Sequence, residues 1–169
     1  NSAVAWRLAA PRPALPVDEA GLKRIEAGAM AVTASAMPDR VRFALDGDLE
    51  AKWLSAAPQA DGEWLRVGFG RDVEVGRLTV LTSRFGVGDY PRSLVVESET
   101  SDGSRAPLFS GSFLPALIRG LASGLTGAPA VLDLPANRSR AVWIRQAGRS
   151  DRWQWAVHEL QVHERLPGM

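Results

Sequence analysis

Hydrophobic and polar residues alternate with a period of two along most of the chain after Gly28. In the clearest run, Leu65, Val67 and Phe69 share one face and Arg66 lies on the other. We expect eight strands, at residues 30–35, 41–45, 64–70, 75–81, 93–99, 130–134, 141–145 and 155–163. Turn-forming residues such as Asp61-Gly62 and Asp102-Gly103 separate the strands. This spacing predicts an all-β fold, an antiparallel sandwich or barrel.

Three segments depart from this period. Residues 1–16 contain repeated prolines, which predicts a linker or a strap over the domain. Leu22 and Ile25 recur at helical spacing in residues 18–26, which favours a short helix or a simple surface turn. Residues 115–127 repeat leucine every four positions but contain three glycines, so we expect a loop with at most one or two helical turns. Residues 27–169 are then one sandwich domain and residues 1–26 precede it.

Composition excludes several classes of protein. The 169 residues, 46% of them hydrophobic, suit one domain with a full core. Twenty basic and nineteen acidic residues give a net charge of +1, which provides no bulk attraction to nucleic acid or to an anionic membrane. No apolar run reaches the roughly 20 residues that span a bilayer, so we expect no membrane insertion by this segment. The absence of cysteine excludes disulfides, thiolate nucleophiles and Cys-based metal sites.

Catalytic motifs are absent from the sequence. His158 and His163 resemble a zinc-protease motif, but they are five residues apart in a segment of period two. We therefore expect one histidine near the core and the other in solvent. No Gly-x-Ser-x-Gly elbow is present, and Gly68-Phe69-Gly70 lacks the third glycine of a dinucleotide site. A pair of carboxylates could still converge in space, but nothing singles out such a pair.

The segment 44–53 contains the turn Asp46-Gly47-Asp48. Two carboxylates two residues apart can place oxygens around a hard cation, since calcium takes six to eight oxygen ligands. The other interpretation is an acidic surface turn.

The neighbours of this turn resemble a known family. The first half contains Val32-Thr33-Ala34-Ser35, then Asp46-Gly47-Asp48 with Trp53 and Ser55, then Pro58-Gln59 and Gly62-Glu63-Trp64-Leu65. The second half contains Asp89-Tyr90-Pro91-Arg92, Asp102-Gly103, the run 143–148 and the run 155–160. Their order over residues 27–164 resembles discoidin domains, also called coagulation factor 5/8 type C domains, and carbohydrate-binding module family 32.

The resemblance implies a jelly-roll β-sandwich of the galactose-binding-domain-like kind, with ligand loops at one end and a structural calcium ion. It implies Asp46, Asp48 and Glu159 as metal ligands, with backbone carbonyls near Phe43 and Ala51. Ala51 stands where the family commonly has Thr, and Lys52 where Arg is usual. Three converging carboxylates would repel one another unless a cation or Lys52 neutralises them.

A sugar site needs an aromatic face for the C–H side of the ring and polar groups for its hydroxyls. Trp153 lies in a polar loop with Arg149, Asp151 and Arg152, where an exposed indole would suit a sugar; the indole could equally pack the loop down. Trp53, Trp64 and Trp143 lie within strand motifs and are expected to be core or semi-buried. Weaker candidates, from loops that the resembling family uses for ligands, are Arg84, Phe85, Asp39 and Arg40.

These observations predict a non-catalytic module that binds a glycan or polysaccharide. The alternative is a structural or interaction domain of a larger cell-envelope glycosyltransferase or glycosidase. The chain begins at Asn1 without an initiator Met or a signal sequence, and we expect it to be covalently part of a larger protein. Lysine is scarce and arginine frequent, which favours a bacterial source, and we expect an extracellular or periplasmic location.

Overall fold

The computed structural model describes residues 21–82 and 88–167. The strands of this part are β1 (Leu22–Arg24), β2 (Ala31–Ala34), β3 (Trp53–Pro58), β4 (Trp64–Val73), β5 (Val75–Leu81), β6 (Ser93–Glu99), β7 (Arg105–Ser112), β8 (Ala130–Asp133), β9 (Ser139–Gln146), β10 (Gln154–Val157) and β11 (Glu159–Arg165). The helices are the 3-10 helices η1 (Ala27–Ala29) and η2 (Pro38–Ala44) and the α-helix α1 (Leu114–Ala122). None of these helices has the length and apolar character needed to cross a membrane.

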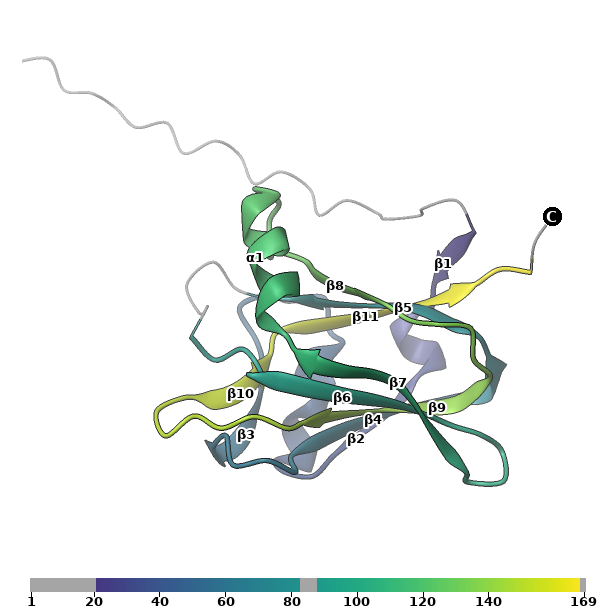
Figure 1. Ribbon diagram of the computed structural model, residues 1–169, viewed down its shortest axis with the longest axis horizontal. Coiled ribbons are helices and arrows are strands. Elements are labelled where there is room, and N and C mark those ends of the chain that lie inside the picture. Colours follow the sequence, from purple (N-terminus) through teal and green to yellow (C-terminus); the bar gives the residue numbers. More distant parts are fainter. Residues whose placement is uncertain (1–20, 83–87, 168–169) are drawn as a thin grey trace, which may run out of the picture.

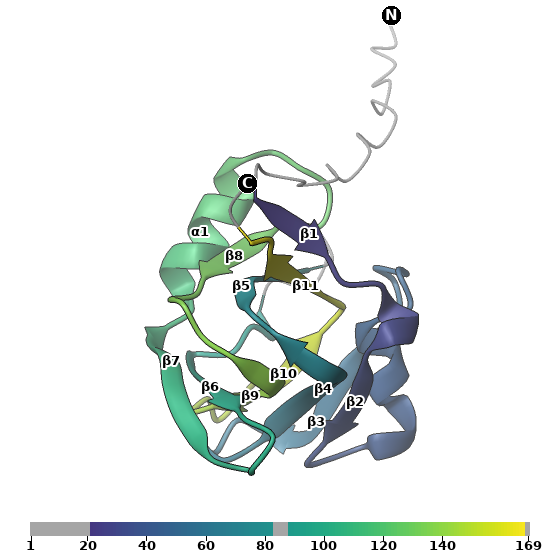
Figure 2. The same cartoon turned by 90° about the vertical axis from the view of Figure 1, so that its right-hand side faces the viewer.

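Two antiparallel sheets form the two layers of the molecule. One has the strand order β1-β11-β5-β8 and the other the order β2-β4-β9-β6-β7. Figure 1 shows α1 beside β8, and Figure 2 shows the four-stranded sheet stacked on the five-stranded one. A short third pairing, β10 with β3, lies toward one end.

The core lies between the layers because the strands alternate buried and partly exposed residues. In β6, Leu94, Val96 and Ser98 are buried and the residues between them are only partly buried. Each sheet therefore presents one apolar face, and stacking the two faces removes both from water. The predicted all-β antiparallel sandwich is confirmed.

The β3–β10 pair carries an aromatic contact in the core. Trp53 and Trp155 are fully buried and meet edge to face, with their ring centroids 5.0 Å apart. Trp53 also donates from Nε1 to the carbonyl of Ala36 at 2.8 Å, which fixes the start of the long β2–β3 connection. Trp64 and Trp143 are partly buried on the five-stranded sheet. The expected core or semi-buried positions of Trp53, Trp64 and Trp143 are confirmed.

Two predicted elements near the N-terminus are wrong. Residues 41–44 form part of η2 instead of a strand, and its buried residues Val41 and Ala44 are three apart, as a 3-10 helix requires. The short helix expected within residues 18–26 is replaced by β1, which pairs antiparallel with β11. Ile25 then enters the core. The sandwich therefore includes residues that we expected to precede it, because pairing with β11 outweighs weak helical spacing.

The region after β6 also differs from the sequence prediction. Residues 105–112, which were not among the predicted strands, form the edge strand β7 and include Pro107. An edge tolerates proline because the missing N–H has no further partner strand, and the pairing shifts register between Val96 and Glu97. The predicted loop at 115–127 contains α1, a helix of nine residues with Pro115 in its first turn.

Candidate functional site

Two buried glutamines tie together the loops at one end of the sandwich. Gln59 donates from Nε2 to the carbonyl oxygens of Tyr90, at 2.9 Å, and Gln154, at 3.2 Å. Its Oε1 accepts from the backbone N–H of Arg92 and from Nε2 of Gln146. Because these groups are buried, each bond would be costly to break. The network holds the segment 88–92 and the loop 147–153 next to each other.

Among the described residues, Trp153 is the exposed aromatic residue of this end, with 44% of the residue exposed. The backbone is fixed on both sides, since its N–H donates to Oγ of Ser150 at 3.0 Å and its carbonyl accepts from the N–H of Gln59 at 3.1 Å. The ring lies against Gly88: a Cβ at that position would be 2.9 Å from Cε2 and Cζ2 of the indole. Gly88 thus supports the ring from one side while much of it remains open to solvent.

Arg92 is held beside Trp153 by backbone oxygens and an aromatic ring. Nη2 donates to the carbonyl of Gly88 at 3.0 Å, and the guanidinium lies 4.1 Å from the ring centroid of Tyr90. Nη1 also donates to the carbonyl of Tyr90 at 3.5 Å, so two of the five guanidinium N–H donors are used within the protein and the others remain for a ligand. This arrangement places a fixed positive charge next to an exposed indole.

A partly buried ion pair holds the segment 88–92. Nζ of Lys52 lies 2.8 Å from Oδ2 of Asp89, whose carboxylate is largely buried. Nε2 of His158 lies 3.9 Å from the same oxygen and has no hydrogen-bond partner in the described structure, whereas Nδ1 lies 2.9 Å from the carbonyl of Leu49. Lys52 therefore neutralises Asp89 and not the Asp46, Asp48 and Glu159 group that the sequence suggested as its target.

Both histidines are buried, which corrects the prediction that one would face solvent. The reason is that the strand is interrupted at His158: β10 ends at Val157 and β11 begins at Glu159. The alternation of faces expected for a continuous strand is lost at this break. His163 lies in β11 opposite Arg77 of β5.

The candidate ligand residues fall into three groups. Arg149, Asp151 and Arg152 are exposed in the loop that carries Trp153. Asp39 and Arg40 are exposed on η2, and no hydrogen bond or ion pair within residues 21–82 and 88–167 joins either to that loop. The third group, Arg84 and Phe85, lies outside the described residues.

The candidate calcium ligands lie on the β2–β3 connection and at the start of β11. Glu159 is 2% exposed, and both of its oxygens accept: Oε1 from Nη2 of Arg24 at 3.2 Å and Oε2 from the N–H of Gly47 at 3.0 Å. Burial raises the pKa of the Glu159 carboxyl; the Gly47 bond and the Arg24 charge oppose this, and the charge of Asp46 adds to it. The loop and the last strand are therefore joined by the N–H of Gly47, whereas the sequence predicted a tie through a cation or Lys52.

The acids of the turn itself are engaged locally. Oδ1 of Asp46 accepts from the N–H of Asp48 at 3.0 Å, and Oδ1 of Asp48 accepts from the N–H of Glu50 at 2.9 Å. Phe43 and Ala51 can offer only backbone carbonyls. In the described part of the chain no three Asp, Glu, His or Cys side chains gather closely enough to hold a metal ion.

This arrangement does not fit a calcium ion as it stands. Calcium needs six to eight oxygens, whereas the one buried carboxylate here has an N–H donor on each oxygen. The guanidinium of Arg24 already supplies a positive charge at Glu159. The calcium ion predicted from the sequence stays a prediction, and for it to bind at Glu159 these donors would have to move.

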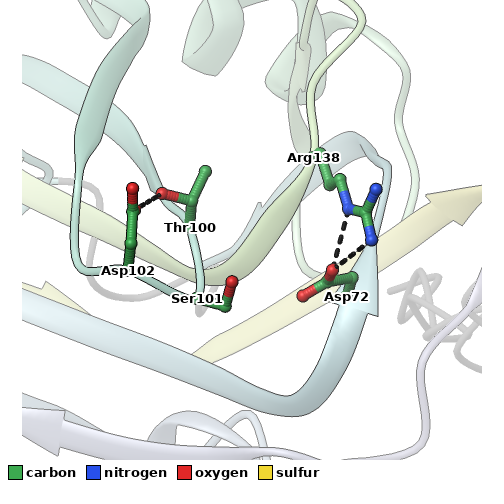
Figure 3. A pocket seen from close by; sticks show the side chains of 5 residues that line it. All are labelled: Asp72, Thr100, Ser101, Asp102 and Arg138. Atoms are coloured by element: carbon green, nitrogen blue, oxygen red, sulfur yellow. Dashed lines mark hydrogen bonds and ion pairs between the residues drawn. The ribbon is translucent and has the colours of Figure 1, made fainter.

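A polar hollow of about 250 Å³ lies where β4, the β6–β7 turn and the β8–β9 connection meet. Figure 3 shows its lining: Arg138 is paired with Asp72 on one side, and Thr100 donates to Asp102 on the other, with Ser101 between them. Hydrogen bonds from Thr100 and Ser104 lower the pKa of Asp102 to about 2. No aromatic ring lines this hollow, and its polar groups bind one another, so it lacks the stacking surface of a sugar site.

The sequence missed most of the groups that surround Trp153. In the sequence, the segment 88–92 served only as a family landmark. No ligand residue was predicted among Gly88, Asp89, Tyr90 and Arg92. One signal was available, because Tyr90 and Arg92 are two residues apart and an extended backbone places such side chains on one face. The Lys52–Asp89 pair had no comparable signal.

No protein-family model matches the chain, and no curated protein matches it by sequence. Solved structures do match. One is the family 32 carbohydrate-binding module of NanJ from Clostridium perfringens in complex with galactose, with a TM-score of 0.67 and 13% identity, covering 85% of this chain and 99% of that one. Another is the family 32 module of AlyQ in complex with 4,5-unsaturated mannuronic acid, with a TM-score of 0.58 and 21% identity, covering 78% of this chain and 92% of that one.

A third matching structure contains more than the module. It is truncated AlyQ with its family 32 module and its alginate lyase domain, with a TM-score of 0.62 and 18% identity. The match covers 87% of this chain and 34% of that one. These likenesses show that the chain has the β-sandwich fold of family 32 carbohydrate-binding modules.

Proposed function

We propose that this domain is a non-catalytic carbohydrate-binding module that recognises a glycan through the segment 88–92 and the loop 147–153. The observation that supports this most is Trp153, a partly exposed indole seated on Gly88 and flanked by Arg92. An aromatic face binds the C–H side of a sugar ring, and fixed donors beside it orient the hydroxyls. Trp153 and Arg92 provide one of each.

The matched structures support the same proposal. They are carbohydrate-binding modules in complex with galactose and with an unsaturated uronic acid. Because one of them is joined to a lyase domain, we infer that this module also belongs to a larger protein, in which another domain performs the chemistry. A location outside the cytoplasm, extracellular or periplasmic, is consistent with a polysaccharide ligand.

A second role, as a structural or interaction domain, is favoured by the outer face of α1. Leu114, Ile118 and Leu121 lie four and three residues apart and are 41%, 54% and 46% exposed. Such spacing places them in one stripe on the helix surface. Exposed apolar stripes of this kind often mark contacts with other proteins. Nothing in the structure shows what covers this stripe.

A glycan array distinguishes the two roles. The proposed function predicts that the wild-type domain binds a defined set of glycans, that Trp153→Ala loses them, and that Ile118→Ser keeps them. Circular dichroism of the three proteins controls for folding. If the wild-type domain binds no glycan on the array, or if Trp153→Ala binds as well as wild type, the function proposed here is wrong and the interaction role is favoured.

A further inference from the structure

We propose that the module selects an acidic glycan, one whose sugar carries a carboxylate or a sulfate group beside the ring stacked on Trp153. This inference rests on the proposed function and specifies the class of sugar. It comes from the arginines of the segment 88–92 and the loop 147–153, which have no carboxylate within ion-pair distance among the described residues.

The arginines around Trp153 have no acidic partner. Among the described residues, no carboxylate lies within ion-pair distance of Arg92, Arg149 or Arg152. Elsewhere most described arginines are paired, although Arg40, Arg42, Arg105 and Arg119 also have no carboxylate within ion-pair distance. Ion pairs join Arg24 to Glu159, Arg66 to Glu99, Arg71 to Glu164, Arg77 to Asp133, Arg138 to Asp72, Arg145 to Asp61 and Arg165 to Glu74.

The acids near Trp153 do not cancel this charge. Asp89 is largely buried and is neutralised by Lys52 at 2.8 Å. Asp151 is exposed in the loop and is the one remaining carboxylate of the described segments 88–92 and 147–153. With Asp89 neutralised by Lys52, three guanidinium groups and one carboxylate leave the segments 88–92 and 147–153 positive, although the whole chain has a net charge of only +1. A positive surface of this kind attracts and orients anions.

Arg92 is also held in a fixed position before any ligand arrives. Its guanidinium is stacked on Tyr90 and donates to the carbonyl of Gly88, the residue on which the indole of Trp153 lies. A positioned guanidinium loses little conformational entropy on binding, and its planar donors match a carboxylate or a sulfate. Hydrogen bonds to such charged acceptors are roughly twice as strong as those to neutral hydroxyls. An acidic sugar therefore uses this site better than its neutral counterpart.

Matched pairs of polysaccharides test the inference. We would titrate the domain with polygalacturonate and with its fully methyl-esterified form, and with dextran sulfate and plain dextran, at low and high salt. We expect the free acid, the sulfated polymer or both to bind at least about tenfold more tightly than the neutral counterpart, with affinity falling as salt rises. The two pairs distinguish a carboxylate from a sulfate as the recognised group.

Substitutions separate the site from general charge attraction. Arg152→Gln should weaken binding of the acid by about tenfold and leave binding of any neutral glycan unchanged. Arg92→Gln should weaken both forms, the acid more than the neutral one, because Arg92 also donates to hydroxyls in the proposed site. Arg138→Gln removes the same charge near the polar hollow and should have no effect. Trp153→Ala should abolish binding of acid and neutral forms alike.

Three results would overturn the inference. Equal affinity for the acid and its ester, with Trp153 still required, would leave a module that binds neutral glycans and would remove only the acidic selectivity. Salt-dependent binding that survives Trp153→Ala would show attraction of a polyanion without a sugar site. Failure of every polymer to bind would also contradict the inference, and an empty glycan array would then remove the proposed function itself.

Discussion

Gly88 lies against the exposed indole of Trp153. Glycine is needed here because a side chain would collide with the ring and not because the backbone has an unusual conformation. A methyl group there would approach two atoms of the Trp153 ring to 2.9 Å, closer than real Cβ contacts allow. Gly88→Ala should therefore displace the indole and weaken glycan binding by about tenfold, since roughly 1.4 kcal/mol changes an affinity by that factor. The unfolding free energy should change little because the ring lies at the surface. Titration with a bound glycan and urea denaturation measure the two effects.

Gly111→Ala is the matched control for this substitution. A Cβ at Gly111 would meet its nearest atom, in the ring of Phe109, at an ordinary 3.7 Å. The variant should bind glycan like the wild type. If Gly88→Ala binds glycan as tightly as the wild type, the observed position of the Trp153 ring against Gly88 is not the position that binds the glycan.

Glu159 provides a prediction about stability. Its carboxylate is 2% exposed, and Arg24 is its cationic partner among the described residues. Arg24→Gln should lower the unfolding free energy by about 1–2 kcal/mol. Breaking a fully buried ion pair costs about 3–5 kcal/mol, and the cost here should be smaller because the Arg24 side chain is 44% exposed. Urea denaturation tests this, with the more exposed Arg138→Gln as a control that should cost less than about 0.5 kcal/mol.

A calcium ion at the predicted site would compete with Arg24 for the carboxylate of Glu159. If Arg24 is the counter-ion, the melting temperature of metal-stripped wild-type protein should not change on addition of millimolar calcium. An ion that binds only the folded protein would raise it by mass action. A clear rise that Asp46→Ala abolishes would show that calcium displaces the observed donors, and the calcium site predicted from the sequence would be confirmed.

Glu99 predicts how stability depends on pH. The hydrogen bond and charge of Arg66 and the indole N–H of Trp143 hold the pKa of Glu99 at about 2, below its usual 4.5. A lowered pKa means that the folded state favours the ionised form, so this contribution is complete above about pH 4.5 and is lost as the pH falls toward 2. It should amount to about 1–2 kcal/mol after allowance for solvent screening.

Glu99→Gln tests this contribution directly. Urea denaturation of the wild type and the variant at pH 6 and pH 2.5 should show a stability gap at the higher pH that narrows at the lower one. Glu97→Gln, a neighbouring residue of the same strand without an ion pair in the described structure, should cost less than about 0.5 kcal/mol at neutral pH. A gap for Glu99→Gln that is the same at both pH values would contradict the assigned cause.

The helix α1 has two faces with different roles. Gly120 is on the buried face, and a Cβ there would lie 2.6 Å from the carbonyl oxygens of Ala128 and Pro129. Gly120→Ala should lower the unfolding free energy by about 1–3 kcal/mol because backbone atoms must move, although alanine favours a helix by about 1 kcal/mol. Ile118→Ser, on the exposed face, should cost less than about 0.5 kcal/mol. Thermal or urea denaturation that ranks the two variants in the opposite order would refute this assignment of faces.

Elements with one buried face could be predicted from the sequence. The strand predicted at 93–99 is observed as Ser93–Glu99 because alternate residues face the core. Residues 41–45 misled the prediction, since Val41, Phe43 and Leu45 alternate although the observed burial has a period of three. β1 forms because it pairs with β11, which is distant in sequence. β7 contains a proline that is tolerated because the strand lies at the edge of its sheet. Neither effect is visible in a local pattern.

The candidate site was predictable only where one loop contains the whole signal. Trp153, Arg149, Asp151 and Arg152 lie within five residues, so an exposed aromatic with charged neighbours could be recognised. Gly88, Lys52 and Gln59 act through contacts with residues distant in sequence. Such contacts depend on how the two sheets bring the loops together in space. Composition and local residue spacing do not determine this arrangement of the loops.

At the scale of the whole molecule, the central claim is that a glycan binds at the end of the sandwich that carries Trp153. The six tryptophans provide internal probes, because each indole N–H gives its own signal in a nitrogen–proton NMR spectrum. Trp53 and Trp155 report on the core, Trp64 and Trp143 on the outer face of the five-stranded sheet, and Trp153 on the proposed site.

The most direct measurement is to titrate the labelled domain with a glycan that it binds and to follow these signals, with Trp153→Phe used to assign the Trp153 resonance. A glycan bound at Trp153 should shift the Trp153 indole signal to saturation while the signals of Trp53 and Trp155 stay in place. A saturating shift confined to Trp64 and Trp143, with Trp153 unmoved, would place the ligand on the sheet face and refute the proposed site.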